Sequence, residues 1–209
     1  MSAGDPELLE RWRAGDRASG NELFERHFRA VFRFFRAKVD EDLAEDLAQQ
    51  TFLGLIAARD RAGLQHGFRA YLFGVARKTL LMHLRTRMRS TPAVDVSASA
   101  IADLEVSAAT RIAVATEHEL LARALRRLPL DFQIAVELYY WESLSTVEIA
   151  EVLELPEGTV RSRLTRARSQ LADHIRAIAD TPELARSTLV DLDAWVASLS
   201  SALAETPAP

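Results

Sequence analysis

Four arginines lie close together in the second half of the chain, at positions 161, 163, 166 and 168. No acidic residue lies between Arg161 and Gln170, so an ion pair inside this stretch cannot neutralise them. Guanidinium groups form paired hydrogen bonds with the major-groove edge of guanine and charge-assisted hydrogen bonds with phosphates. The cluster therefore predicts contact with DNA. The alternative is an ordinary solvated helix that is rich in arginine.

Two short helices joined by a tight turn must position these arginines. Ser145 and Glu148 have the spacing of a capping box, in which each side chain binds a free amide at the start of a helix. A second helix follows Pro156, and its apolar residues repeat on the side away from the arginines: Val160, Leu164, Ala167 and Leu171. This pattern is typical of a helix-turn-helix, whose second helix enters the DNA major groove.

The composition limits what else the protein can do. The chain has 209 residues, of which 48% are hydrophobic, and it has no cysteine, which excludes disulfides and thiolate metal sites. The start of the chain lacks the pattern of a signal peptide, and no apolar run reaches the length of about 20 residues that spans a bilayer. We therefore expect a soluble, cytoplasmic protein that is not inserted in a membrane.

Charge is distributed unevenly along the chain, although its net value is −4. A second stretch without acids, from Arg77 to Arg89, contains five basic residues. An acidic chain with two basic patches suits local contact with phosphates.

Catalysis has little support in the sequence. The five histidines (27, 66, 83, 118 and 174) have no metal-ligand spacing, and neither a glycine-rich phosphate loop nor a nucleophile motif is present. We expect scattered surface histidines, no metal, no cofactor and no enzyme activity.

Helical periodicity runs through almost every segment, which predicts an all-α fold. We expect two small helical domains joined by a linker. The first domain covers residues 1–90. The linker, 91–116, is marked by a shift to Ser, Thr, Ala, Val and Asp. The second domain, 117–179, is a helix-turn-helix domain of winged-helix-like type, and residues 180–209 are a C-terminal extension with an amphipathic helix.

Caps and apolar stripes predict the helices within these domains. Asp5 before Pro6 resembles a helix start, Asp16 or Asn21 can cap the next helix, and an acidic turn at 40–42 opens a third, which ends near residue 59. A fourth runs over about 68–88. Two more, at 117–128 and 131–141, precede the helix-turn-helix. The second helix is expected to bury one stripe: Phe24, Phe28, Val31, Phe32, Phe35 and Val39.

The extension carries its own stripe after Thr181, made of Leu189, Leu192, Val196, Leu199 and Leu203. One interpretation is a helix that packs on the second domain. The other is a regulatory helix that masks a DNA-binding surface or another functional surface of the protein, or receives a partner.

Taken together, the two halves resemble one family. The resemblance covers roughly residues 5–178 and rests on three runs: AEDLAQQTFL at 44–53, FRAYLFGVAR at 68–77 with His-Leu-Arg at 83–85, and PEGTVRSRL at 156–164. On these motifs the chain is similar to bacterial sigma factors of the extracytoplasmic-function (ECF) type, in the sigma-70 family, with a region 2 domain and a region 4 domain. The resemblance implies a subunit that binds RNA polymerase core, recognises two promoter elements and helps to melt the DNA.

The resemblance also implies roles for particular residues. At the −35 element it implies base contacts from Arg161, Ser162, Thr165 and Arg166, while Arg163 and Arg168 serve phosphates or the domain surface. A helix around Asp46 is expected to bind a basic coiled coil of the largest polymerase subunit. Its acidic and polar face consists of Asp42, Glu45, Asp46 and Gln49. An anti-sigma factor is implied as a further partner.

At the −10 element the family implies capture of unpaired bases, which need an aromatic stacking surface and nearby cations. We expect Tyr71 to stack and Arg77, Lys78, Arg85 and Arg87 to follow the backbone, while Phe68 and Phe73 can belong to the core. Lys78 and Met82 stand where the family usually has Asn and Asp, which bears on −10 specificity. Glu154 stands where the turn usually has glycine, so it must adopt a left-handed conformation or alter the turn.

Two other classes of protein remain as alternatives. A dimeric operator-binding regulator would share the helix-turn-helix but would leave the first domain unexplained. A helical adaptor that binds only protein would leave both basic patches unexplained.

Overall fold

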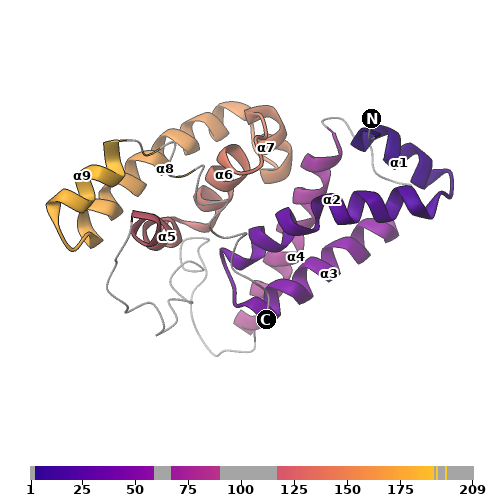
Figure 1. Cartoon of the computed structure of the whole chain (residues 1–209), viewed down its shortest axis with the longest axis horizontal. Coiled ribbons are helices and arrows are strands. Elements are labelled where there is room, and N and C mark those ends of the chain that lie inside the picture. The colour runs from indigo at the N-terminus through magenta and orange to yellow at the C-terminus, as the bar shows by residue number, and fades with distance from the viewer. Residues whose placement is uncertain (1–2, 59–66, 90–116, 191, 193–195, 197–209) are drawn as a thin grey trace. The chain divides into compact units, whose positions relative to one another are not determined.

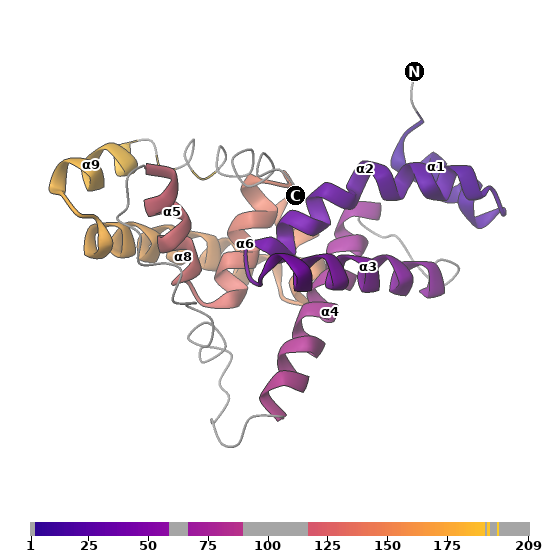
Figure 2. The same ribbon diagram turned by 60° about the horizontal axis from the view of Figure 1, so that its bottom comes forward.

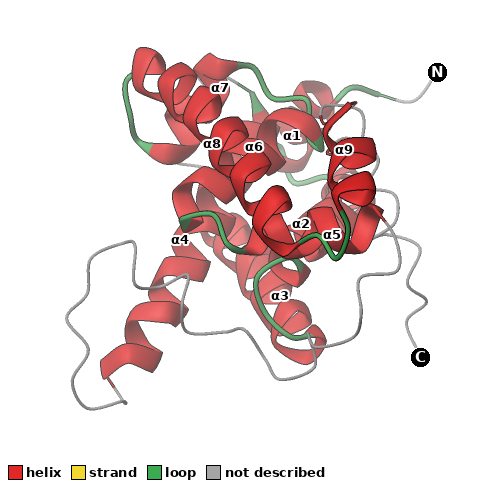
Figure 3. Cartoon of the chain, turned by 90° about the vertical axis from the view of Figure 1, so that its left-hand side faces the viewer, coloured by secondary structure: helices red, strands yellow, loops and turns green. Residues whose placement is uncertain are grey.

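The computed structural model describes residues 3–58, 67–89, 117–190, 192 and 196. The described residues form helices and contain no strand (Figure 3), which confirms the all-α prediction; the helix-turn-helix is not accompanied by a β-wing among them. The expected linker at 91–116 lies outside the described residues. The helices divide into two units.

Four helices pack in chain order in the first unit: α1 (Asp5–Arg13), α2 (Arg17–Arg36), α3 (Glu41–Ala58) and α4 (Phe68–Arg89). Helices α2 and α3 lie side by side (Figures 1 and 2). Asp16 caps α2 by accepting a hydrogen bond from the Ala18 amide at 3.0 Å, whereas Asn21 lies inside that helix. The cap of α1 is Gly4, one residue before the expected Asp5.

The core of the first unit only partly follows the expected stripe on α2. Val31, Phe35 and Val39 are buried, but Phe28 is 37% exposed, and Phe34 is buried although it is not in the stripe. The reason is that α2 contacts α1, α3 and α4, so its buried face is wider than one stripe and shifts along the helix. The ring of Phe28 stacks on the rings of Phe32 and Phe52 at this partly exposed position.

The second unit is built around a long helix, α8 (Glu157–Ile178), which packs against α5 (Glu117–Arg126), α6 (Leu130–Tyr140) and α9 (Pro182–Val190). Helix α7 (Thr146–Leu153) is joined to α8 by the turn at 154–156, and Thr146 donates a hydrogen bond to Glu157 at 2.6 Å. The bounds differ from the expected ones by one or two residues at most ends. One side of α8 is therefore buried against these helices, and the other side is exposed to solvent.

The C-terminal extension begins with a packed helix. The Thr181 hydroxyl accepts a hydrogen bond from the Leu184 amide at 3.2 Å, and α9 buries Ala185 and Thr188 against α5 and α8. Beyond it, the Trp141 indole donates to the Val196 carbonyl at 2.7 Å. The helix at 182–190 therefore packs on the second unit through Ala185 and Thr188, whereas Leu189 of the expected stripe is only half-buried. Packing of the stripe as a whole stays a prediction. Leu199, Leu203 and Trp195 lie outside the described residues.

Candidate nucleic-acid interface

The helix-turn-helix has the local geometry that its sequence predicts. Ser145 and Glu148 form the capping box: the Ser145 amide donates to the Glu148 carboxylate at 2.7 Å, and the Glu148 amide donates to the Ser145 hydroxyl at 3.3 Å. Glu154 is left-handed, with a φ of 57°, so it takes the conformation that glycine usually supplies in this turn. The turn is thus kept, with strain at one residue.

Helix α8 separates a buried face from a polar one. Val160, Leu164, Ala167 and Leu171 are all buried, as the periodicity predicts. The opposite side carries four exposed residues of the predicted −35 set: Arg161, Thr165, Arg166 and Arg168. Ser162 is half-buried.

Side chains on the polar face of α8 hold one another. Arg166 donates to the Ser162 hydroxyl at 2.7 Å, and the Thr165 hydroxyl donates to the Arg161 carbonyl at 3.1 Å. Arg161 donates to Glu157 at 2.6 Å. This acidic partner lies four residues before Arg161, outside the acid-free stretch.

Arg163 differs from the other three arginines. It lies 3.0 Å from Asp131 of α6, its guanidinium lies over the Phe132 ring at 5.5 Å, and its side chain is only 17% exposed. These contacts join α6 to α8. They favour the domain-surface role for Arg163 over a direct contact with DNA.

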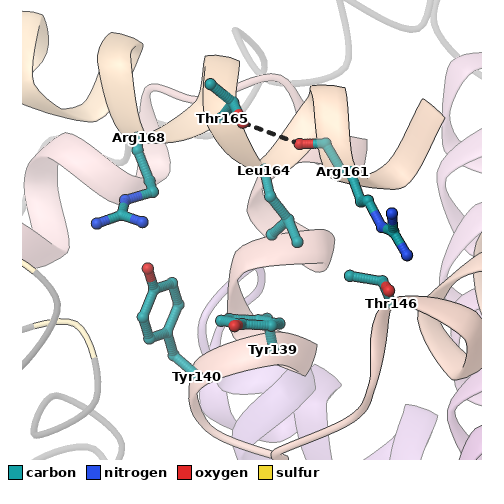
Figure 4. A pocket seen from close by; sticks show the side chains of 7 residues that line it. All are labelled: Tyr139, Tyr140, Thr146, Arg161, Leu164, Thr165 and Arg168. Carbon is teal, nitrogen blue, oxygen red and sulfur yellow. Dashed lines mark hydrogen bonds between the residues drawn. The ribbon is translucent and has the colours of Figure 1, made fainter. Parts of the chain in front are cut away.

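A hollow of about 200 Å³ opens beside the polar face of α8 (Figure 4). Arg161, Leu164, Thr165 and Arg168 contribute from α8. Tyr139 and Tyr140 come from the end of α6, and Thr146 comes from the start of α7. The sequence prediction missed these last three residues; the adjacent tyrosines just before the capping box were the available signal.

The predicted polymerase-binding face lies on α3. Its four members, Asp42, Glu45, Asp46 and Gln49, are all exposed. Gln49 donates to the Glu45 carboxylate at 3.3 Å. Leu53 (64% exposed) and Ile56 (42% exposed) follow on the same helix, so an apolar end continues the acidic face.

Helix α4 carries the predicted −10 residues. Lys78, Arg85 and Arg87 are exposed, and Tyr71 and Arg77 are half-buried. Phe68 and Phe73 are 2% and 0% exposed. The prediction that both rings can belong to the core is therefore confirmed. Met82 is 62% exposed on this helix.

His27 contradicts the expectation of surface histidines. Its side chain is buried in the first unit, and its Nε2–H donates to the Asp5 carboxylate at 2.7 Å. Burial lowers the pKa of His27 below its usual 6.5, although Asp5 works against this shift. No group of His, Cys, Asp and Glu side chains suited to a metal occurs among the described residues.

Two families of known protein domains match this chain. The sigma-70 region 2 family matches residues 23–90, and the sigma-70 region 4 family matches residues 118–171. The ECF RNA polymerase sigma-E factors of Haemophilus influenzae and Escherichia coli K12 are each 29% identical over 182 residues, which is 83% of this chain and 96% and 95% of theirs.

The chain is an ECF RNA polymerase sigma factor of the sigma-70 family. As such, it is a non-catalytic polymerase subunit that directs transcription initiation.

Solved structures share the fold of this sigma factor. The sigma factor RpoE in complex with the anti-sigma factor NepR from Bartonella quintana has a TM-score of 0.57 at 21% identity, covering 76% of this chain and 97% of that one. CnrH in complex with the cytosolic domain of CnrY has a TM-score of 0.58 at 22% identity, covering 84% and 99%.

The matched residues place the sigma-factor regions on the helices. Region 4 covers the helix-turn-helix, and region 2 covers α3, α4 and most of α2. Helices α1 and α9 lie outside both matches. In the described part of this sigma factor, no helix has the length and apolar character needed to cross a membrane.

Proposed function

We propose that the sigma factor divides promoter recognition and polymerase binding among three helices. Helix α8 reads the −35 element, α4 holds unpaired bases of the −10 element, and α3 binds the coiled coil of the largest polymerase subunit. The observation that carries the proposal is the polar face of α8, which presents Arg161, Thr165 and Arg166 on a helix fixed by its buried stripe.

At the −35 element, Arg161 and Arg166 supply the base contacts. Each guanidinium can donate two parallel hydrogen bonds to guanine O6 and N7, and Ser162 and Thr165 can donate to bases or phosphates. Arg168 supplies a phosphate contact, which positions the helix without reading sequence. Arg163 is left in the contact between α6 and α8.

At the −10 element, Tyr71 stacks on an unpaired base while Arg77, Lys78, Arg85 and Arg87 follow the phosphates. Phe68 and Phe73 are excluded from stacking by their burial. With Lys78 and Met82 in place of the usual Asn and Asp, this helix offers a cation and a thioether where the family has an amide and a carboxylate. We therefore infer a −10 preference that differs from that of family members with Asn and Asp at these two positions.

For the polymerase, the α3 face offers carboxylates from Asp42, Glu45 and Asp46 to arginines of the coiled coil. Leu53 and Ile56 extend this face with apolar area, which supplies the less salt-sensitive part of binding. An anti-sigma factor is a further partner under this proposal, because one protein of the same fold is solved with the anti-sigma factor NepR and another with the cytosolic domain of CnrY. Action in the cytoplasm follows from the same proposal.

Run-off transcription with purified core polymerase tests the division of roles. We expect Arg161→Ala combined with Arg166→Ala to abolish dependence on the −35 element, since base contacts are lost, while core binding measured by native gel shift persists. Asp46→Arg is the complementary variant on α3. It should weaken core binding because it reverses a charge, and circular dichroism should show that the fold is unchanged. Loss of core binding in the arginine double variant would contradict the assignment.

A further inference from the structure

We propose that Glu157 is a positioning residue for −35 recognition: its carboxylate holds the Arg161 guanidinium in place and ties it to the start of α7. Glu157 itself makes no contact with a base. The proposal rests on the proposed contact between Arg161 and the −35 element.

The contacts of Glu157 link both helices of the helix-turn-helix. Its Oε1 accepts one hydrogen bond from the Thr146 hydroxyl at 2.6 Å and another from Arg161 Nη2 at 2.6 Å. Thr146 is the first residue of α7, Glu157 is the first residue of α8, and Arg161 lies one turn further along α8. Thr146 and Arg161 both line the hollow beside the polar face, at the same end (Figure 4).

The charge of Glu157 is favoured where it lies. A carboxylate in the first turn of a helix interacts well with the helix dipole, and an acid four residues before a cation is the better order for an ion pair. The hydrogen bond from Thr146 and then the one from Arg161 lower the pKa of Glu157, so it is ionised at neutral pH. Its side chain is 35% exposed, against 67% for Arg161.

Holding Arg161 matters for recognition because arginine has a long and flexible side chain. A guanidinium has N–H donors on three nitrogens, so it can bind Glu157 through one edge and guanine through another. Ordering the side chain before DNA binds reduces the entropy that is lost on binding. The negative charge also opposes contact with phosphates at random sites. Glu157 thus raises the preference for the correct base over other bases.

A simple surface ion pair would behave differently. Exposed pairs contribute little to stability, and a pair with no other role would leave base preference unchanged. The measurement that separates the two is the ratio of transcription from the native −35 element to transcription from elements with single base changes.

The experiment uses the full chain with core polymerase. We expect Glu157→Gln to lower that ratio about threefold, part of the discrimination that a good paired contact provides, and only at the base pair where Arg161→Ala also lowers it. Binding to DNA without a promoter should rise. Thr146→Val, which removes one of the two hydrogen bonds, should cause a smaller change in the same direction. The matched control is Asp173→Asn, which removes a carboxylate paired with Arg176 at 2.9 Å on the same helix.

Each result decides the proposal. The combination of Glu157→Gln with Arg161→Ala should discriminate no worse than Arg161→Ala alone, since one residue acts through the other. If Arg161→Ala lowers the ratio at a base pair but Glu157→Gln and Thr146→Val do not, the positioning role is wrong while the proposed function stands. If Arg161→Ala changes no ratio, the proposed contact itself is wrong. If Glu157→Gln changes the transcription ratio equally at every base pair, or if Asp173→Asn causes the same change, Glu157 acts only through its overall charge and the proposal is wrong.

Discussion

Glu154 carries backbone strain at the turn between α7 and α8. Its φ of 57° places a residue with a Cβ in the left-handed region, which costs about 1–2 kcal/mol for most residues. Ser143, just before the capping box, is left-handed as well, with a φ of 51°. Helix α7 is thus preceded by one left-handed residue, Ser143, and followed by another, Glu154. Glycine would adopt either conformation more easily.

We expect Glu154→Gly to raise the free energy of unfolding by about 0.5–1 kcal/mol, the strain relieved less the entropy cost of glycine. Chemical denaturation of the full chain measures it. Glu154→Ala is the matched control, because it removes the carboxylate and keeps the strain. A glycine variant no more stable than the alanine variant would show that the turn is not strained.

His27 predicts a dependence of stability on pH. Because its pKa is lowered in the folded state, the unfolded chain binds more protons below pH 6.5, so stability is lost as pH falls through that value. The slope for one proton is at most about 1.4 kcal/mol per pH unit. Urea denaturation between pH 8 and pH 5 should show the loss, and His27→Gln, which can still donate to Asp5, should show less of it. An equal slope in both proteins would assign the loss to other groups.

At the scale of elements, α1 and α2 meet at Gly20. A Cβ at this position would lie 2.6 Å from two atoms of the Trp12 ring, which is buried and packs edge-on against Phe24 at 5.3 Å. The absence of a side chain on Gly20 therefore sets how closely the two helices approach.

We expect Gly20→Ala to lower the free energy of unfolding by about 1–2 kcal/mol, since overpacking costs more than the helix gains from alanine. Gly74→Ala on α4 is the control: no atom lies within 4 Å of its Cβ position, so the same change should stabilise by about 0.5–1 kcal/mol. Chemical denaturation of both variants and of the unchanged protein measures these free energies. If both variants were equally stable, the close approach would be unimportant.

For the whole molecule, the C-terminal extension is one of the parts that lie outside both matched families. Its packing on α5 and α8 and the hydrogen bond from Trp141 to Val196 make it a piece of the second unit. A regulatory role for this segment stays a prediction.

Deleting residues 180–209 should lower the melting temperature of the protein by several degrees, because the buried faces of α5 and α8 become exposed. Deleting only residues 198–209 keeps α9 and Val196, so the difference in melting temperature between the two deletions measures what the described part of the extension contributes. Run-off transcription on both proteins tests regulation separately. Unchanged melting together with unchanged activity in the longer deletion would contradict both roles.

The sequence alone determined the features that depend on neighbours along the chain. The capping box at Ser145 and the buried stripe of α8 follow from spacings of three or four residues, which a helix converts directly into contacts. For the start of α2 and for Glu154 the sequence left two alternatives each, and the structure decided for Asp16 as the cap and for the left-handed conformation. The family followed from the same local runs.

Only the tertiary structure decided which residues from distant segments meet. It paired Arg163 with Asp131, buried His27 against Asp5, exposed Phe28, and brought Tyr139 and Tyr140 to the polar face of α8. Periodicity shows which side of a helix is apolar, but the identity of the partner across an interface depends on how helices cross. The arginines of α8 could therefore be predicted from the sequence, whereas the partners that distant segments bring to them, such as Asp131 for Arg163, could not.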